Sequence, residues 1–135
     1  MRRSTIRAEV ETISGGRVLW VDDTPTNNLR EVQALRTLGV EVDLVTRNQE
    51  ARQLVVAFEY DLVLSDIGRD PRSEESGLEM PQLLRECGKQ VPLAFYVGGR
   101  EGKKTEEGTP VFDAPSELLR FIAETLGQGS EGGGR

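Results

Sequence analysis

The chain has 135 residues, of which 36% are hydrophobic and 30% are charged, and its formal net charge is −6. At about 100–200 residues per domain, this length predicts one globular domain and excludes a two-domain enzyme. The excess of acidic residues argues against direct binding of nucleic acid, whose phosphates attract clustered cations. The absence of histidine and the single cysteine exclude histidine-based catalysis, histidine-ligated metals, an internal disulfide and a multi-cysteine zinc site.

The two ends of the chain differ in composition from its middle. Residues 1–16 contain a pattern that permits a short helix, but they lack the apolar core of a signal peptide. No apolar run approaches the roughly 20 residues that cross a bilayer. We therefore expect a cytoplasmic protein without membrane contact. Residues 127–135 are rich in Gly and predict a flexible tail, so that residues 17–126 form the folded domain.

The first half of this domain alternates strand and helix patterns. Residues 17–21 are a short apolar run that predicts a strand. Residues 27–38 predict a helix that ends at Gly39. Its apolar residues, at helical spacing, are Leu29, Val32, Leu35 and Leu38. Residues 40–45 alternate apolar and polar side chains as a second strand, and the next helix begins near Asn48, a candidate cap.

The second half continues the alternation. In chain order we expect a strand at 61–65, a polar loop at 68–76, a helix at about 78–87, a strand at 93–97, a remnant strand at 111–112 and a helix from Pro115. Residues 98–109 lack an apolar face, so a fourth helix there would be short or frayed. Gly127 is the expected end of the last helix. Together these elements predict an α/β fold: a doubly wound, five-stranded parallel sheet with helices on both faces.

Acidic residues follow two of the expected strands. Asp22 and Asp23 come directly after the first strand, and Asp66 follows the third. Ligands of doubly wound sheets bind beyond the carboxyl ends of the strands, so these carboxylates converge if the two strands are neighbours. One such acid would more often cap a helix or begin a turn. Three close carboxylates repel one another unless a hard divalent cation lies among them, and this favours an Mg²⁺ site.

Three segments resemble the receiver domain of two-component response regulators: residues 18–23, residues 61–66 and Ala114-Pro115. The resemblance covers about residues 17–126 and implies a flavodoxin-like receiver fold. It further implies phosphorelay signal transduction rather than enzymatic turnover. The implied partners are a histidine kinase or phosphotransfer protein and an unknown effector protein.

The same resemblance assigns roles to individual residues. Asp66 would bind Mg²⁺ and accept the phosphoryl group, and Asp23 would bind Mg²⁺ directly. Asp22 would bind the cation through water, and the Gly68 carbonyl would be a further ligand. The chemistry agrees with these roles, because a carboxylate attacks phosphorus in line while the cation neutralises charge on the transferring oxygens.

The chain departs from the receiver pattern at two positions. Receivers usually carry Thr or Ser at the end of strand four, where this chain has Val97, and Lys before the last proline, where it has Ala114. Both groups contact the phosphoryl group, so a phosphorylated state should be less stable here. The amides of Gly98 and Gly99 are candidates for compensating phosphoryl contacts, because no Cβ obstructs them.

The leading hypothesis is therefore a stand-alone, atypical receiver domain that is phosphorylated on Asp66 with Mg²⁺ and signals through protein contact. One alternative is a pseudo-receiver that binds its partner constitutively, which Val97 and Ala114 favour. A second alternative is an adaptor that binds a small molecule in the strand-end cleft. A carboxylate-based phosphohydrolase fits less well, because Asp22-Asp23 lacks the two-apart spacing such chemistry commonly uses.

Overall fold

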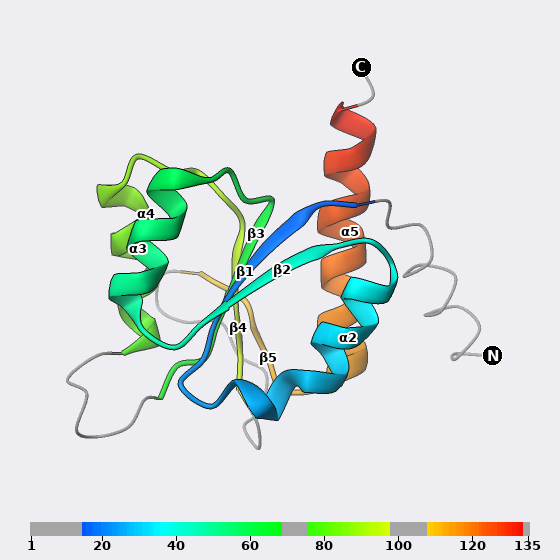
Figure 1. The fold of residues 1–135 in the computed structure, drawn as a ribbon, viewed down its shortest axis with the longest axis horizontal. Helices are drawn as coiled ribbons and strands as arrows, with labels where there is room; N and C mark the ends of the chain where they lie inside the picture. Colours follow the sequence, from blue (N-terminus) through cyan, green and yellow to red (C-terminus); the bar gives the residue numbers. More distant parts are fainter. Residues whose placement is uncertain (1–14, 69–75, 98–107, 134–135) are drawn as a thin grey trace.

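In the computed structural model, helices cover both faces of a five-stranded parallel sheet whose strand order is β2-β1-β3-β4-β5 (Figure 1). The structure describes residues 15–68, 76–97 and 108–133. The strands are β1 (Arg17–Val21), β2 (Glu41–Val45), β3 (Leu62–Ser65), β4 (Leu93–Tyr96) and β5 (Val111–Phe112). The helices are η1 (Pro25–Asn28), α2 (Leu29–Thr37), α3 (Asn48–Ala57), η2 (Gly77–Glu79), α4 (Met80–Glu86) and α5 (Pro115–Gly133), where η marks 3₁₀ turns. The predicted doubly wound fold is confirmed.

Each face of the sheet has its own hydrophobic core. Successive residues of a strand point to opposite faces, so Val18 and Trp20 pack under α2 and α5, whereas Leu19 and Val21 pack under α3 and α4. Figure 1 shows the two helix pairs on opposite sides of the sheet. All four of these β1 side chains are fully buried. Residues 18–21 of β1, an interior strand, are all apolar because both faces of the strand are covered.

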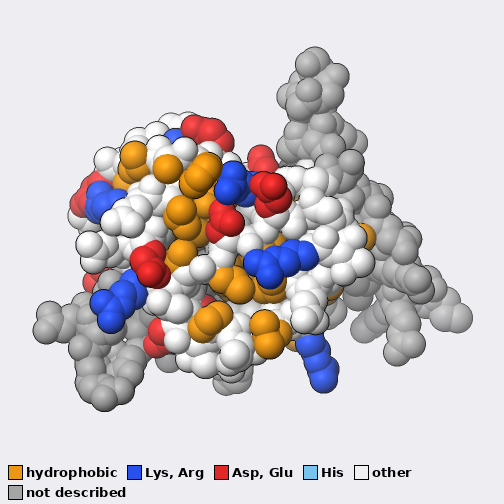
Figure 2. Space-filling model, viewed as in Figure 1, with side chains coloured by type: hydrophobic (Ala, Val, Ile, Leu, Met, Phe, Trp, Pro, Cys, Tyr) orange, Lys and Arg blue, Asp and Glu red, His pale blue; other side chains and the backbone are white. Residues whose placement is uncertain are grey.

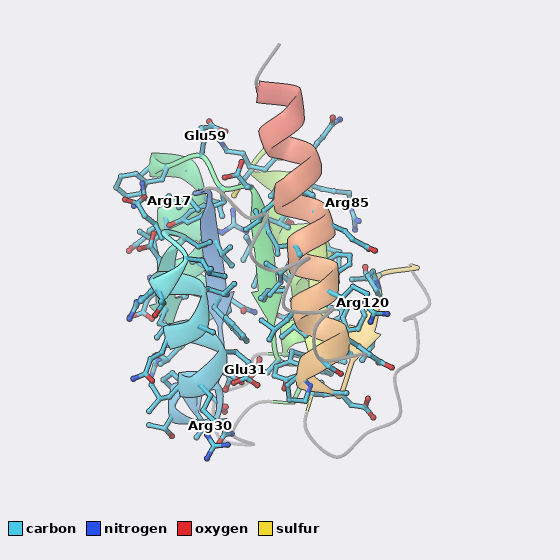
Figure 3. The ribbon with its side chains drawn as sticks, turned by 90° about the vertical axis from the view of Figure 1, so that its right-hand side faces the viewer. Arg17, Arg30, Glu31, Glu59, Arg85 and Arg120 are labelled. Atoms are coloured by element: carbon cyan, nitrogen blue, oxygen red, sulfur yellow. The ribbon has the colours of Figure 1, made fainter. Side chains whose placement is uncertain are left out.

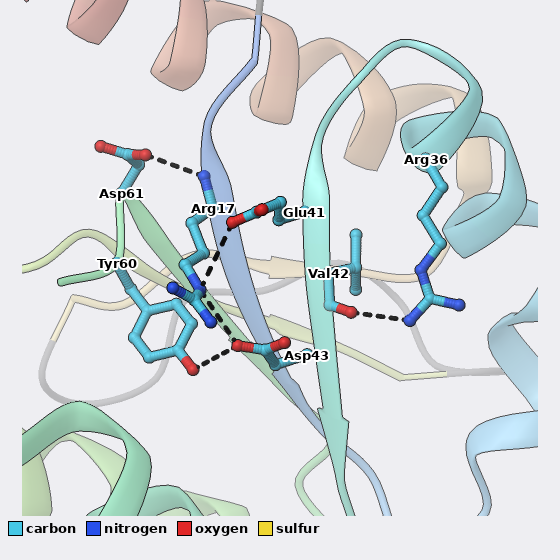
Figure 4. Close-up of polar contacts among 7 residues, drawn as sticks. All are labelled: Arg17, Arg36, Glu41, Val42, Asp43, Tyr60 and Asp61. Carbon is cyan, nitrogen blue, oxygen red and sulfur yellow. Dashed lines mark hydrogen bonds and ion pairs between the residues drawn. The ribbon is translucent and has the colours of Figure 1, made fainter. Parts of the chain in front are cut away.

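A cluster of polar side chains joins β1, β2 and the segment before β3 at the end of the sheet opposite the acids (Figure 4). Arg17 Nε donates to Asp43 Oδ2 at 3.2 Å, and the Tyr60 hydroxyl donates to the same oxygen at 2.5 Å. The guanidinium also stacks over the ring of Phe58, 4.2 Å from its centroid. The Arg17 backbone amide donates to Asp61 at 2.9 Å, so this one residue ties the strand to both neighbours.

Some predicted boundaries and faces were wrong. The helix expected over residues 27–38 begins as a 3₁₀ turn, and Leu29 is 46% exposed, because the turn rotates it off the core-facing stripe. Asn48 does not cap α3 with its side chain, which donates instead to the Ser76 carbonyl at 3.1 Å.

The last helix extends past Gly127, where the sequence predicted its end, to Gly133, and its final turns project beyond the sheet (Figure 1). Glycine costs a helix about 1 kcal/mol relative to alanine, which weakens a helix without forbidding it. Once the buried turns of α5 have formed, each added residue only extends an existing helix. Within the described ranges, no helix combines the length and the apolar character of a membrane span. Residues 1–14 and the region of the expected fourth helix from 98 to 107 lie outside the described residues.

Candidate functional site

The register of β1 and β3 brings the three predicted acids together. Val21 lies beside Ser65 in the parallel ladder, and the Asp66 amide donates to the Val21 carbonyl at 3.0 Å. Asp22 and Asp66 therefore leave adjacent strands at the same level. One carboxylate oxygen from each of Asp22, Asp23 and Asp66 lies within 4.8 Å of the other two.

The carboxylate of Asp22 is held from two sides by the turn that follows β1. Its Oδ1 accepts a hydrogen bond from the Thr24 amide at 2.7 Å, and its Oδ2 accepts one from the Asn28 side-chain amide at 2.9 Å. Asp22 and Asn28 are both buried. The 3₁₀ turn η1 therefore positions Asn28, because it returns the chain so that the Asn28 side chain reaches Asp22, six positions earlier.

Asp66 is anchored through both its side chain and its backbone. Oδ2 accepts a hydrogen bond from the Asp23 amide at 3.2 Å, and the Asp66 carbonyl accepts one from the Ser65 hydroxyl at 2.7 Å. Asp66 is 7% exposed, whereas Asp23 is half-buried at the mouth of the site. Asp66 is thus fixed in position, and Asp23 is more accessible to solvent than Asp66.

A glycine that the sequence reasoning did not assign to the site lies against Asp66. Gly77 is buried, and its amide donates to the Ile67 carbonyl at 2.9 Å. A Cβ at Gly77 would lie 1.6 Å from the Asp66 carbonyl oxygen. The available sequence signal was Ser76, which accepts from the Leu78 amide at 3.1 Å as the cap of η2 and so fixes where the turn begins.

The acids open into a polar cavity of about 500 Å³ at the carboxyl ends of the strands. Its lining consists of Asp22, Asp23, Asn27, Asn28, Asp66, Ile67, Gly68, Tyr96 and Val97. The predicted ligand Gly68 is therefore at this cavity. Gly98 and Gly99, the candidate phosphoryl contacts, lie outside the described residues. Three carboxylate oxygens beside open space fit Mg²⁺, which prefers hard oxygen ligands and retains several waters.

At the rim of the cavity, Val97 presents methyl groups where receivers carry a hydroxyl. Val97 is 8% exposed. The preceding residue, Tyr96, has a hydroxyl, but this group donates to Glu31 of α2 at 2.8 Å. The Glu31 side chain points into the molecule, whereas the side chain of its neighbour Arg30 points toward solvent (Figure 3). Burial raises the pKa of the Tyr96 hydroxyl above its usual range, and the hydrogen bond and charge of Glu31 act in the same direction.

Comparison with known sequences finds partial matches to a sensor protein. Over 91 residues the chain is 31% identical to the sensor protein EvgS of Escherichia coli strain K12, and the match covers 67% of this chain and 7% of that protein. The EvgS of Escherichia coli O157:H7 is 30% identical over 91 residues with the same coverage. The chain thus spans a small part of these curated relatives. No family model matches the chain.

Solved structures resemble the chain more extensively. The receiver domain of the hybrid histidine kinase CckA is 23% identical, with a TM-score of 0.63 over 82% of this chain and 99% of that one. The chain has the fold of a response-regulator receiver domain. A chain from the complex of histidine kinase ThkA with response regulator TrrA is 24% identical, with a TM-score of 0.69 over 82% of this chain and 98% of that one. The anti-anti-sigma factor PhyR of Bartonella quintana is 15% identical, with a TM-score of 0.70 over 95% of this chain and 55% of that one.

Proposed function

We propose that the chain is a phosphorelay receiver that accepts a phosphoryl group on Asp66 with Mg²⁺ bound beside it. The observation that supports this most directly is the convergence of Asp22, Asp23 and Asp66 within 4.8 Å at the carboxyl ends of β1 and β3. A carboxylate pair can hold a cation, and the third acid, fixed by its backbone, is then positioned as the nucleophile. We further propose that this signalling role is not enzymatic, and that it operates in the bacterial cytoplasm.

The proposed reaction is a phosphoryl transfer to a carboxylate. An oxygen of Asp66 forms a bond to phosphorus while the bond between phosphorus and the donor breaks, and the donor leaves as free imidazole of a phosphohistidine or as acetate from acetyl phosphate. Bound Mg²⁺ would neutralise charge on the transferring oxygens. Asp22 and Asp23 are the residues that would hold it, together with Asp66 and the carbonyl of Gly68. The Asp23 amide, which donates to Asp66, keeps the nucleophile oriented toward the cavity.

The proposed donor is a histidine kinase or a phosphotransfer protein, and the proposed output is contact with an effector protein. The structural similarity to a chain from the complex of kinase ThkA with regulator TrrA supports a kinase as the donor. On the face shown in Figure 2, described Lys and Arg side chains are scattered among Asp and Glu. That distribution supports a protein partner over the phosphate backbone of a nucleic acid.

The test is phosphate incorporation. The full chain, incubated with radiolabelled acetyl phosphate and Mg²⁺, should form an acid-stable, hydroxylamine-sensitive acyl phosphate. The Asp66→Asn variant should incorporate none. Asp61→Asn is a matched control, because Asp61 also adjoins β3 but lies at the opposite end of the strand, where it accepts from the Arg17 amide. Equal labelling of the wild-type chain and Asp66→Asn would contradict the proposal.

A second function is favoured by one part of the site. Val97 and Ala114 supply neither hydroxyl nor cation, and Asp113 places an acid next to the position of the missing Lys. These residues suit a receiver fold that binds its partner without phosphorylation. In that case Asp66→Asn would leave partner binding unchanged, whereas the phosphorelay function predicts that partner binding depends on Asp66.

A further inference from the structure

Asn28 lies beside the carboxylate of Asp22, at the point where η1 passes into α2. Its side chain is 3% exposed, and its amide nitrogen donates to Asp22 Oδ2 at 2.9 Å. Asp22 is 7% exposed, so bulk water competes little for this contact. Hydrogen bonds to an ionised acceptor are among the stronger ones in proteins. The buried amide therefore determines which way Asp22 faces.

The two oxygens of Asp22 are held by different donors. The Thr24 amide donates to Oδ1 at 2.7 Å, opposite the Asn28 contact on Oδ2. Because each oxygen accepts one hydrogen bond from the described residues, the carboxylate is oriented without a cation, and these contacts leave one lone pair on each oxygen. This state suits an acid that accepts hydrogen bonds from cation-bound water. The same state does not suit a carboxylate that coordinates a cation through both of its oxygens.

This difference separates two common divalent cations. Mg²⁺ requires near-octahedral geometry and keeps several of its waters, whereas Ca²⁺ takes six to eight oxygens and often binds carboxylates through both oxygens. We propose that Asn28 is a positioning residue of the cation site, which fixes Asp22 as a ligand through water and thereby favours Mg²⁺ over Ca²⁺. The inference rests on the proposed function, because it takes the acid cluster to be an Mg²⁺ site.

Separate titrations of the full chain with Mg²⁺ and Ca²⁺ test this assignment. Calorimetry is the first measurement, and the fluorescence of Trp20, the sole tryptophan, two positions before Asp22, is the second. Loss of a residue that orients a ligand typically costs 10–100-fold in metal affinity, so Asn28→Ala should weaken Mg²⁺ binding about tenfold. Ca²⁺ binding should weaken less, which lowers the Mg²⁺ preference. Asn28→Leu fills a similar volume but has no hydrogen-bond donor, so it should weaken Mg²⁺ binding as much as Asn28→Ala does.

Thr26→Ala is the matched control. Thr26 is exposed, lies in the same 3₁₀ turn as Asn28 and is not among the residues that line the cavity. Its replacement should leave both affinities unchanged. Unfolding of each variant in EDTA separates loss of fold from loss of binding.

A double-mutant cycle then distinguishes positioning from a general structural effect. Residues that act through one contact are non-additive, so Asn28→Ala should weaken Mg²⁺ binding no further in an Asp22→Ala background. Unchanged Mg²⁺ affinity in both Asn28 variants, or an equal loss in both backgrounds, would overturn the assignment and leave the metal site standing. A wild-type chain that binds no Mg²⁺ would overturn it together with the proposed function.

Discussion

Gly77 lies directly against the backbone of Asp66. A Cβ at Gly77 would be 1.6 Å from the Asp66 carbonyl oxygen and 2.9 Å from the Ile67 Cα. Both clashing groups are backbone, which cannot rotate away as the end of a side chain can. The position of Asp66, the proposed phosphoryl acceptor, therefore depends on a residue without a side chain in the turn before α4.

Gly77→Ala should accordingly damage both the fold and the site. Overpacking a filled interior costs about 1–3 kcal/mol, and a contact this short to backbone places the expected loss of unfolding free energy at the upper end of that range. Urea denaturation measures the loss, and Mg²⁺ titration should show weakened binding because Asp66 is displaced. Gly68→Ala is the control, since nothing lies within 4 Å of a Cβ there. Equal stability of the two variants would refute the account.

Both tyrosines should make stability depend on alkaline pH. Burial is the largest cause that raises the pKa of Tyr60 and Tyr96 in the folded chain, and hydrogen bonds to Asp43 and Glu31 add to it. An unfolded tyrosine loses its proton near pH 10, at about its reference pKa. The stabilisation is therefore complete below about pH 10 and is lost as pH rises toward the folded pKa values.

Urea denaturation at a series of pH values from neutral to alkaline measures this dependence. The wild-type chain should lose stability above about pH 10. A chain carrying Tyr60→Phe and Tyr96→Phe should be less stable at neutral pH, because Asp43 and Glu31 each lose a donor, and should show a flatter alkaline slope. Tyrosine absorbance in the native wild type should show ionisation only above the range of free tyrosine. A native chain whose tyrosines ionise normally would contradict the prediction.

The sequence predicted the sheet and the acid cluster because both depend on local patterns. Short apolar runs before Asp22 and before Asp66 identify buried parallel strands, and parallel strands place their carboxyl ends at one edge. The residues that orient the acids were harder to predict. Asn28 donates to Asp22 from the end of the 3₁₀ turn η1, and the apolar periodicity from residue 27 does not distinguish this turn from an α-helix.

Long-range contacts explain the remaining differences. The hydroxyl of Tyr96 donates a hydrogen bond to Glu31, which lies 65 positions earlier in the chain. No local sequence pattern predicts this contact between a buried carboxylate of α2 and a hydroxyl next to the cavity. Leu29 belongs to the helical apolar pattern in sequence, yet the turn that serves the site leaves it exposed. The Asn48 side chain donates a hydrogen bond to the Ser76 carbonyl, which lies outside its own helix.

The polar cluster at the other end of the sheet should stabilise the fold through Asp43 rather than Glu41. Both acids lie within salt-bridge distance of Arg17, but Asp43 is 3.2 Å from Nε with a side chain 31% exposed, whereas Glu41 is 3.7 Å away and 72% exposed. Asp43 also accepts from Tyr60. Exposed ion pairs contribute little, while partly buried ones with several hydrogen bonds contribute more.

Asp43→Ala should thus lower the free energy of unfolding by about 1 kcal/mol or more, because two donors lose their acceptor. Glu41→Ala should change it by less than about 0.5 kcal/mol. Urea denaturation at low and high salt checks both values. An effect of Glu41→Ala as large as that of Asp43→Ala would show that net charge, rather than the shared acceptor, governs this cluster.

If the proposed function holds, adding the hydroxyl and the cation of the receiver pattern should strengthen binding of a phosphoryl mimic. Val97 lines the cavity beside Asp66, and Val97→Thr adds a hydroxyl at nearly constant shape. Ala114→Lys adds a cation before Pro115, where Asp113 otherwise supplies a negative charge. A hydrogen bond to a charged group contributes about 1.5–3 kcal/mol, so each substitution should tighten beryllofluoride binding by roughly tenfold or more.

Titration of the Mg²⁺-loaded chain with beryllofluoride, followed by amide NMR, measures this affinity in the wild type, each single variant and the double variant. Val97→Ala is the control, because it enlarges the cavity without adding a donor, and it should not tighten binding. The Asp66→Asn substitution should abolish binding in every background, since beryllium bonds to the acceptor carboxylate. If the double variant binds beryllofluoride no better than the wild type, the absent hydroxyl and cation are not what limits the phosphorylated state, and the constitutive alternative gains support.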